Sequence, residues 1–490
     1  MATPRSKPTS SASKASLRTY RAKRDPAKTP EPMGDRPARR SKAKLKFVIQ
    51  EHHARALHWD LRLEHDGVLA SWALPKGIPE HPKVNHLAVH TEDHPIDYDT
   101  FEGEIPAGEY GGGTMRIWDR GTFEVEKWKP AEVIVVLHGT RVSGRYVLFA
   151  TDGKNWMIHR MDPAPEGFEL LPKSVKPMLA TAGALPRDDS GWAYEIKWDG
   201  VRAITFVDGG RIRMQSRNDQ ELAPAFPEFR EIGEVVGARP CVLDGEIIVM
   251  GEDGVPDFGR LAHRLHLTKA ASIKTQAAQS PASYVIFDLL HLDGHSLVDR
   301  TYDERREQLE QLTLSGTSFT TAESFRGVKG ADILEATKAA GLEGVIAKAR
   351  RSTYQPGRRS DQWIKIKNVR TQEVVIGGWT PGAGNRAGSI GALLLGVPGD
   401  KGLRYVGKVG TGFSEADRAE LLDLLERART TQSPFVPPSD VEERAIHYFV
   451  RPQHVGEVRF TEWTSAGRLR HPTWRGLRVD KAPEEVTIES

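Results

Sequence analysis

Cysteine is almost absent from this sequence, because Cys241 is the only one among 490 residues. A lone cysteine excludes an internal disulfide framework and any cysteine-rich metal site, and it fits a reducing compartment. Long apolar runs are also missing. No stretch approaches the roughly 20 apolar residues of a membrane-spanning helix, and the N-terminus lacks the apolar segment of a signal peptide. We therefore expect a cytoplasmic protein.

Aliphatic residues are scarce in the first 46 positions, and the charge there is one-sided. This segment holds 14 Lys and Arg against 3 Asp and Glu, a balance of +11. Since the whole chain carries +3, the remaining 444 residues carry −8. The composition predicts a basic arm, 1–46, that is largely disordered. A flexible basic arm gains affinity for a polyanion by releasing counterions from phosphates, although a merely solubilising tail has the same composition.

The sequence does contain a lysine set between apolar residues and followed by a turn, in Glu195-Ile196-Lys197-Trp198-Asp199-Gly200. This pattern is typical of a strand that ends in a tight turn, with the amine projecting into a cleft. A nucleophilic lysine must lose a proton from an amine whose ordinary pKa is about 10.4, and apolar walls and a nearby cation favour that loss. Ile196 and Trp198 can form the walls, and Arg202 can supply the charge. A surface lysine beside a hairpin turn is the alternative interpretation.

Further short motifs follow Lys197 in order: Ser216-Arg217-Asn218, Leu243-Asp244-Gly245-Glu246-Ile247-Ile248, Tyr284-Val285-Ile286-Phe287-Asp288, Glu343-Gly344-Val345-Ile346-Ala347-Lys348 and Trp363-Ile364-Lys365-Ile366-Lys367. Together they resemble the nucleotidyltransferase motifs of ATP-dependent DNA ligases and, more distantly, of mRNA capping enzymes. Near the end, Arg475 and Arg478-Val479-Asp480-Lys481 resemble the last ligase motif. A basic strand on a nucleic-acid-binding barrel is the rival interpretation of that last stretch.

The resemblance implies that Lys197 is the nucleophile that becomes bonded to AMP. It implies that the ATP-binding residues are Glu195, Arg202, Arg217, Glu246, Phe287, Glu343, Lys348, Lys365, Lys367, Arg478 and Lys481. Within this set Glu246 and Glu343 are expected to bind Mg²⁺ or Mn²⁺, since Mg²⁺ takes few protein oxygens beside phosphate oxygens. The Phe287 ring is expected to stack on adenine, whereas its apolar run alone favours a core aromatic. Arg478 and Lys481 are expected to orient pyrophosphate.

A second pattern with chemical potential lies upstream, where His58, Asp60, Arg62 and Glu64 fall at every second position. On a strand these side chains share one face, and the leucines and Trp between them face the core. With His52 the row offers nitrogen and oxygen ligands for a divalent transition metal, and the arginine can clamp a phosphate. A solvated strand face is the alternative.

Three motifs in this region, Q-x-H-x5-H-x-D-x-R, E-D-H-P-x-x-Y and R-D-x5-E, resemble the 3′-phosphoesterase module of bacterial DNA ligase D. The resemblance implies three manganese ligands: His52, His58 and Asp60. It implies that the phosphate is addressed by Arg24, Arg62, His94 and Tyr98, with Arg62 and His94 catalytic and with Asp25 and Glu31 in support. Such a module removes a terminal ribonucleoside and then the 3′-phosphate. One departure is Asn85-His86, where this family carries an arginine.

Composition and turn signals predict a mostly β, α+β multidomain chain. We expect a phosphoesterase β-barrel over 47–163, to whose site 20–46 contributes, and a linker over 164–175. An α+β, ATP-grasp-like nucleotidyltransferase domain is expected over 176–368, and a five-stranded OB-fold over 369–490 with a helix near 415–429. Strands 201–207 and 211–216 flank Asp208-Gly209-Gly210, a good hairpin signal.

The predicted function is an ATP-dependent DNA ligase that seals 5′-phosphate and 3′-hydroxyl ends after its phosphoesterase has healed the 3′ end, in non-homologous end joining. No primase-like polymerase module lies in these 490 residues, so the Ku end-binding protein and a separate polymerase are expected to act in trans. Because the expected substrate is broken DNA, we expect the protein to be associated with the nucleoid. An RNA ligase or capping-type nucleotidyltransferase, and a catalytically silent DNA-end scaffold, are the alternatives.

Overall fold

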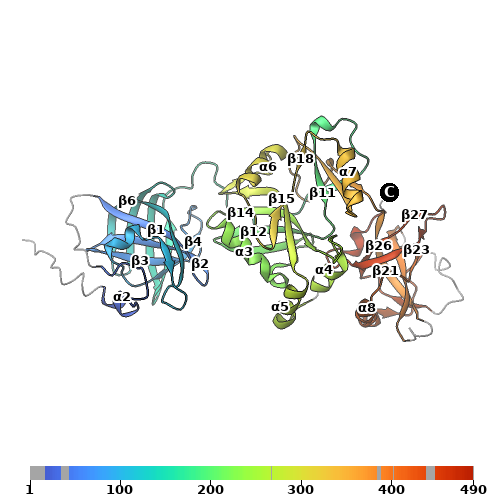
Figure 1. The fold of residues 1–490 in the computed structure, drawn as a ribbon, viewed down its shortest axis with the longest axis horizontal. Helices are drawn as coiled ribbons and strands as arrows, with labels where there is room; N and C mark the ends of the chain where they lie inside the picture. Colours follow the sequence, from blue (N-terminus) through green and yellow to red (C-terminus); the bar gives the residue numbers. More distant parts are fainter. Residues whose placement is uncertain are drawn as a thin grey trace, which may run out of the picture.

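The computed structural model describes residues 17–34, 44–265, 267–382, 388–400, 402–436 and 447–488. The rest of the predicted basic arm, 1–16 and 35–43, therefore lies outside the described residues. Figure 1 shows a β-barrel in blue, a central α+β body in green and yellow, and a C-terminal β body in orange and red. Among the described helices, none is long and apolar enough to cross a membrane.

The first body is a closed barrel of eight strands. Its order is β1-β2-β3-β4-β9-β8-β7-β6, with β6 pairing back onto β1 and β5 extending from β6. The strands are β1 (Leu45–His53), β2 (Leu57–His65), β3 (Val68–Leu74), β4 (Asn85–His90), β5 (Gly103–Ile105), β6 (Gly113–Lys129), β7 (Glu132–Gly139), β8 (Ser143–Asp152) and β9 (Asn155–Arg160). Alternate side chains of β2, including Trp59 and Leu61, fill the barrel core as predicted. A short helix, α2 (Arg18–Ala22), and a 3-10 helix, η1 (Ile96–Thr100), lie beside it.

The central body is built on two sheets. One has the order β10-β20-β19-β11-β18 and the other β13-β12-β14-β15-β16, with β17 on β15. Their strands are β10 (Leu179–Ala182), β11 (Trp192–Lys197), β12 (Val201–Asp208), β13 (Arg211–Ser216), β14 (Cys241–Val249), β15 (Ala282–Leu292), β16 (His295–Ser296), β17 (Phe319–Thr321), β18 (Phe325–Arg326), β19 (Gly344–Ala349) and β20 (Arg359–Lys367). The helices are α3 (Arg230–Val236), α4 (Phe258–Leu265), α5 (Ala270–Gln279), α6 (Tyr302–Gln311) and α7 (Gly330–Ala339).

The predicted hairpin is present, because β12 and β13 pair antiparallel around Gly209 and Gly210. Both glycines have positive φ, 55° and 70°, which a two-residue type I′ turn requires. Buried Cys241 begins β14, and burial raises the pKa of its thiol. Cys241 is thus a packed core residue.

The C-terminal body carries a sheet of seven strands, consistent with an OB-fold. They are β21 (Thr371–Pro381), β22 (Ile390–Gly399), β23 (Gly402–Val409), β24 (Arg429–Thr430), β25 (Tyr448–Val450), β26 (Val455–Arg459) and β29 (Thr473–Leu477). This exceeds the five strands expected because β24 and β25, of two and three residues, add short pairings at one edge. A separate pair is β27 (Glu462–Trp463) with β28 (Leu469–Arg470). Helix α8 (Glu415–Arg427) starts at the capping box of Ser414, close to the predicted helix.

The C-terminal body closes against the central body. Helix α4 packs on β29, and the Arg478 guanidinium lies 4.8 Å from the Phe258 ring centroid. Asn218 donates a hydrogen bond to the Asp480 carbonyl at 2.8 Å, and Arg475 pairs with Asp199 just after the β11 strand. This closure brings the last motif onto the end of β11, where Lys197 lies.

Candidate functional sites

Lys197 is the last residue of β11, and its neighbour strand places a carboxylate beside it. In the antiparallel pair β11–β19, Lys197 lies opposite Gly344, so Glu343 immediately precedes that position. The Lys197 ammonium is hydrogen-bonded to Glu343, and the Lys367 ammonium lies 3.6 Å from the other carboxylate oxygen. Burial disfavours the charged carboxylate, but the two lysines outweigh it and hold the pKa of Glu343 below its usual value. One buried carboxylate thus separates two cations that both face the cleft.

The cleft around Lys197 collects most of the predicted ATP-binding residues. Those that line it are Arg202, Arg217, Glu246, Phe287, Glu343, Lys348, Lys365, Lys367, Arg478 and Lys481. Glu195 lies behind this wall, where it pairs with the Lys348 ammonium at 2.8 Å and accepts a hydrogen bond from the Tyr302 hydroxyl at 2.6 Å. Burial lowers the pKa of Lys348, even though Glu195 favours its charged form. These residues come from both sheets and from the C-terminal body.

An aromatic ring and a guanidinium lie together in this cleft. The Phe287 ring is only 8% exposed, and the Arg202 guanidinium carbon stands 4.4 Å from its centroid. Arg202 is fixed by a bidentate pair with Asp244 at 2.5 and 2.6 Å. The Tyr354 hydroxyl donates a third bond to Asp244 at 2.6 Å. Sequence reasoning assigned no role to Asp244 or Tyr354, although alternation in the Asp244-Gly245-Glu246 stretch places both carboxylates on one strand face.

Glu246 is the second carboxylate at the cleft. Burial raises its pKa to about 7, against the opposing effect of the Arg202 and Lys197 charges. With Glu343 it offers oxygen ligands on the wall around Lys197, which is the donor type that Mg²⁺ and Mn²⁺ take when phosphate oxygens complete the shell. The carboxylate pair therefore fits a divalent ion that arrives with a triphosphate.

The cations on the C-terminal side of the cleft are held by carboxylates. Arg478 forms a bidentate pair with Asp480 at 2.9 and 2.7 Å. Lys481 pairs with Glu373 at 2.8 Å. Each cation is thus positioned before any anion enters, which lowers the cost of ordering it on binding.

The barrel carries the second constellation, a compact group of His52, His58 and Asp60. Their candidate ligand atoms all lie within 4.8 Å of one another. His52 donates from Nε2 to the Gly111 carbonyl at 2.9 Å, and its buried Nδ1 has no hydrogen-bond partner among the described residues. His58 donates from Nδ1 to the Ala56 carbonyl at 2.9 Å, which leaves the lone pair on Nε2, 3.8 Å from an Asp60 oxygen. Fixing one ring nitrogen so that the other is a lone-pair donor is typical of metal-binding histidines, so the group fits a divalent transition metal.

The middle of the polar face of β2 is buried, whereas His58 and Glu64 toward its ends are half-buried. Asp60 and Arg62 are 6% and 2% exposed. Arg62 donates to Gln50 at 2.7 Å, to Ser71 at 3.1 Å and to Asp60 at 2.9 Å. Burial opposes the charge on Asp60, but Arg62 and the two histidines outweigh it and hold the pKa of Asp60 well below its usual range. Asp60 is therefore ionised and directed toward the histidines.

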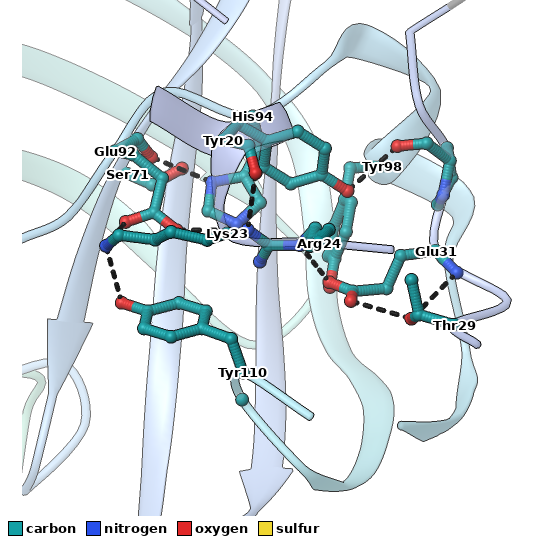
Figure 2. Close-up of polar contacts among 12 residues, drawn as sticks. Tyr20, Lys23, Arg24, Thr29, Glu31, Ser71, Glu92, His94, Tyr98 and Tyr110 are labelled. Carbon is teal, nitrogen blue, oxygen red and sulfur yellow. Dashed lines mark hydrogen bonds and ion pairs between the residues drawn. The ribbon is translucent and has the colours of Figure 1, made fainter. Parts of the chain in front are cut away.

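Residues 17–34 reach the barrel and bring charges beside Glu92, His94 and Tyr98, as Figure 2 shows. Arg24 pairs with Glu31 at 2.8 Å and with Glu92 at 3.1 Å. Tyr98 donates its hydroxyl to Glu31 at 2.8 Å. Asp25 is not brought into this cluster, because its carboxylate caps its own turn at Ala27 and faces Lys28. Glu92, which sequence reasoning had quoted within a motif but given no role, is a member.

His94 lies at the centre of the cluster. Burial, with Arg62 and Arg24 nearby, holds its pKa well below the usual histidine value. Its Nδ1 donates to the Glu92 carbonyl at 2.8 Å, so the neutral ring carries its lone pair on Nε2. The departure at Asn85-His86 lies on β4, where His86 bonds to the Gly77 carbonyl at 2.9 Å and Asn85 to His159 at 2.8 Å.

Comparison with known families gives three matches along the chain. Residues 50–150 match the DNA Ligase D 3′-phosphoesterase domain, 173–367 the ATP dependent DNA ligase domain, and 386–481 the ATP dependent DNA ligase C terminal region.

Two curated relatives and one solved structure illustrate the likeness. "Multifunctional non-homologous end joining protein LigD" of Mycolicibacterium smegmatis is 46% identical over 96% of this chain, which spans only 61% of that relative. "DNA ligase C1" of the same species is 34% identical over 64% of this chain and 93% of its own length. A solved "mycobacterial DNA ligase D complexed with ATP and MES" is 40% identical, with a TM-score of 0.49, over 64% of this chain and 98% of its own.

Proposed function

This chain belongs to the ATP-dependent DNA ligases and carries ahead of its ligase domain the 3′-phosphoesterase domain of DNA ligase D, and we propose that it heals and seals broken DNA. An ATP-dependent ligase domain implies ATP and a divalent metal. The observation that carries the sealing activity is Lys197, at the end of β11, facing a cleft shared with Glu343, Phe287 and the closing C-terminal motif.

The first step joins Lys197 to AMP. The Lys197 Nζ, once unprotonated, attacks the α-phosphorus of ATP, the new nitrogen–phosphorus bond forms, and the bond to the β-phosphate breaks so that pyrophosphate leaves. Phe287 stacks on adenine, and Lys365 and Lys367 stabilise charge on the phosphate oxygens. Arg478 and Lys481 hold the departing pyrophosphate. A divalent ion bound by Glu246 and Glu343 supplies further charge stabilisation when present.

The next two steps transfer the activation to DNA. A 5′-phosphate oxygen attacks the phosphorus of the lysine-bound AMP and releases Lys197. The neighbouring 3′-hydroxyl then attacks that 5′-phosphorus, and AMP leaves as the backbone is sealed. Because only a 3′-hydroxyl can attack, an end that carries a 3′-phosphate or a blocked ribonucleotide needs prior healing.

The barrel cluster supplies that healing in our proposal. Arg24 and Arg62 clamp the 3′-phosphate, because guanidinium groups match phosphate oxygens geometrically. Water attacks the phosphorus and gives a proton to Nε2 of His94, which is neutral with its lone pair on that atom. The bond from phosphorus to the 3′ oxygen breaks, and that oxygen takes up a proton to leave as the 3′-hydroxyl. Tyr98 and Glu31 hold Arg24 and the segment 17–34 in place, and Asp25 has no assigned contact with the phosphate. Mn²⁺ on His52, His58 and Asp60 polarises the phosphate when bound.

The biological setting follows from the relatives rather than from the site. We propose a role in non-homologous end joining, because relatives that match 96% of this chain bear that name. The Ku end-binding protein and a separate polymerase are proposed partners, and action on chromosomal DNA places the protein in the cytoplasm at the nucleoid. Mg²⁺ or Mn²⁺ in the ligase cleft and Mn²⁺ in the barrel are our metal assignments.

The proposal is tested by labelling with α-labelled ATP and Mg²⁺, followed by denaturing electrophoresis. We expect a covalent label on the natural protein and none on Lys197→Ala, because no other amine replaces the nucleophile. Lys338→Ala, an exposed lysine on α7, is the matched control and should label normally. Chasing the label into nicked DNA but not nicked RNA separates a DNA ligase from an RNA ligase. Absence of label from folded natural protein, with pyrophosphatase present, would contradict the ligase proposal.

A further inference from the structure

Tyr110 is an exposed aromatic residue beside the buried cluster of Arg24, Arg62 and His94, here called the phosphate cluster. It has no role in the proposed removal of the 3′-phosphate. It keeps 46% of its surface exposed, in the loop between β5 and β6. The next residue, Gly111, supplies the carbonyl that accepts the His52 hydrogen bond at 2.9 Å. Tyr110 is therefore one residue from the group that orients a candidate metal ligand.

Two cations hold the Tyr110 ring, as Figure 2 shows. Lys23 lies 4.2 Å from the ring centroid and hydrogen-bonds to the hydroxyl at 2.9 Å, and the Arg24 guanidinium lies 5.3 Å from the centroid. Lys23 is itself fixed by Glu92 at 2.8 Å. The ring is thus oriented by cation–π and hydrogen-bond contacts while nearly half of the residue stays open to solvent.

The position of Arg24 indicates what this ring meets. Arg24 is buried in the phosphate cluster, whereas Tyr110 lies at its exposed edge. The Arg24 guanidinium lies close to the Tyr110 ring, so the sugar and base attached to a phosphate bound by Arg24 can reach that ring. Aromatic side chains bind nucleic-acid strands by stacking on bases, and they do so with little sequence preference because every base has a π face. The side chain of Lys23, 31% exposed, supplies a cation for a second phosphate.

We propose that Tyr110 and Lys23 form a nucleoside subsite of the phosphoesterase. Tyr110 stacks on the base at the 3′ end of the strand, and Lys23 contacts the phosphodiester on the 5′ side of that nucleotide. The inference rests on the proposed phosphoesterase function. It makes the 3′-terminal nucleotide, rather than a free phosphate monoester, the unit that the site recognises, and it implies tolerance of all four bases.

The test measures kcat and KM for 3′-phosphate release from a primer–template with Mn²⁺. Tyr110→Ala should raise KM by about 5- to 150-fold, the range that loss of one base stack produces, and change kcat little. Tyr110→Phe should keep most of the binding because the ring remains. Leu87→Ala, another exposed apolar residue of the barrel at 40%, is the matched control and should match the natural protein.

A second substrate with an abasic terminal nucleotide completes the cycle. On this substrate the KM of the natural protein should rise by about the same factor as the KM of Tyr110→Ala rises on the normal end. Tyr110→Ala should have the same KM for both substrates. Equal KM for Tyr110→Ala and the natural protein would overturn the subsite. Equal losses of kcat in Tyr110→Ala and Tyr110→Phe would overturn stacking in favour of a hydroxyl that merely positions Lys23. No 3′-phosphate release by the natural protein would instead overturn the phosphoesterase function itself.

Discussion

At the scale of single residues, the ligase cleft depends on two carboxylates with opposite pKa shifts. Glu343 is kept ionised by Lys197 and Lys367, whereas burial raises the pKa of Glu246 to about 7. A carboxyl group must lose its proton before it binds a divalent ion. Of these two carboxylates, Glu246 is therefore the one whose metal-binding form changes near neutral pH.

We predict that the Mg²⁺ concentration for half-maximal adenylation falls as pH rises from 6 to 8. With a pKa of about 7, Glu246 is ionised in about a tenth of molecules at pH 6 and in about nine tenths at pH 8. Because its pKa is raised, Glu246 is mostly protonated and free of metal below pH 7. Above pH 7 it is mostly ionised, and its affinity for Mg²⁺ increases. Initial rates of lysine labelling against Mg²⁺ concentration at several pH values check this.

The control for this prediction is Glu246→Gln, which cannot ionise at that position. Its remaining labelling should need more Mg²⁺ than the natural protein at pH 8 and should lose most of the pH dependence. If the natural protein and Glu246→Gln show the same change in Mg²⁺ requirement between pH 6 and 8, titration of ATP itself would explain the effect, and Glu246 would not.

At the scale of elements, the segment 17–34 completes the barrel site. Its helix α2 buries Tyr20, and its loop carries Glu31, whose side chain is fully buried against Arg24. Removing Glu31 leaves a buried arginine with less than its full set of partners, which is costly. The barrel strands alone therefore supply metal ligands and Arg62 but not the complete phosphate cluster.

Two truncations test this division. Deleting 1–16 should leave 3′-phosphate release close to that of the full chain, because the described residues that form the cluster all lie beyond residue 16. Deleting 1–34 should reduce release by at least about 100-fold, since it removes Arg24, whose charge-assisted bonds to the phosphate in our proposal are worth roughly 1.5–3 kcal/mol each. Lysine labelling should be the same in both, because the ligase cleft is lined from residue 177 onward. Full phosphatase activity without 1–34 would contradict the assembly.

At the scale of the whole molecule, the hairpin turn of the central body docks on the barrel. Lys76, beyond β3, pairs with Asp208 at 2.6 Å. A Cβ on Gly209 would lie 2.7 Å from the Lys76 Cα, and one on Gly210 would lie 2.6 Å from the Leu57 side chain. Leu57 directly precedes the metal-ligand candidate His58. The ligase body therefore approaches the phosphoesterase where β2 begins.

Proximity in solution can be measured with engineered cysteines, because the lone natural cysteine is buried. Lys76→Cys with Asp208→Cys should crosslink with a short bismaleimide, whereas Lys154→Cys with Asp208→Cys should not, since the β8–β9 turn lies at the other end of the barrel. Comparable yields for the two pairs would mean that the bodies tumble independently. An exposed ion pair contributes only about 0–1 kcal/mol, so charge reversal alone is a weaker test.

The sequence by itself determined the features that depend on local order. Alternation along β2 predicted a row of polar side chains on one face, Asp208-Gly209-Gly210 predicted the hairpin, and the motif order from Lys197 to Lys481 predicted residues that line one cleft. These signals are readable because strand period and turn chemistry are set by neighbours in the chain. The domain boundaries and the roles of individual site residues stay predictions.

Only the tertiary structure decided which groups meet. Lys197 and Glu343 are 146 residues apart in sequence, and strand pairing makes them neighbours. Arg62 on the polar face of β2 is buried against Gln50, Ser71 and the Tyr98 ring, contacts that no local pattern indicates. In the same packing the Tyr98 hydroxyl donates a hydrogen bond to Glu31, and Asp25 stays outside the cluster. Long-range contacts depend on the whole fold, so spacing along the chain cannot reveal them.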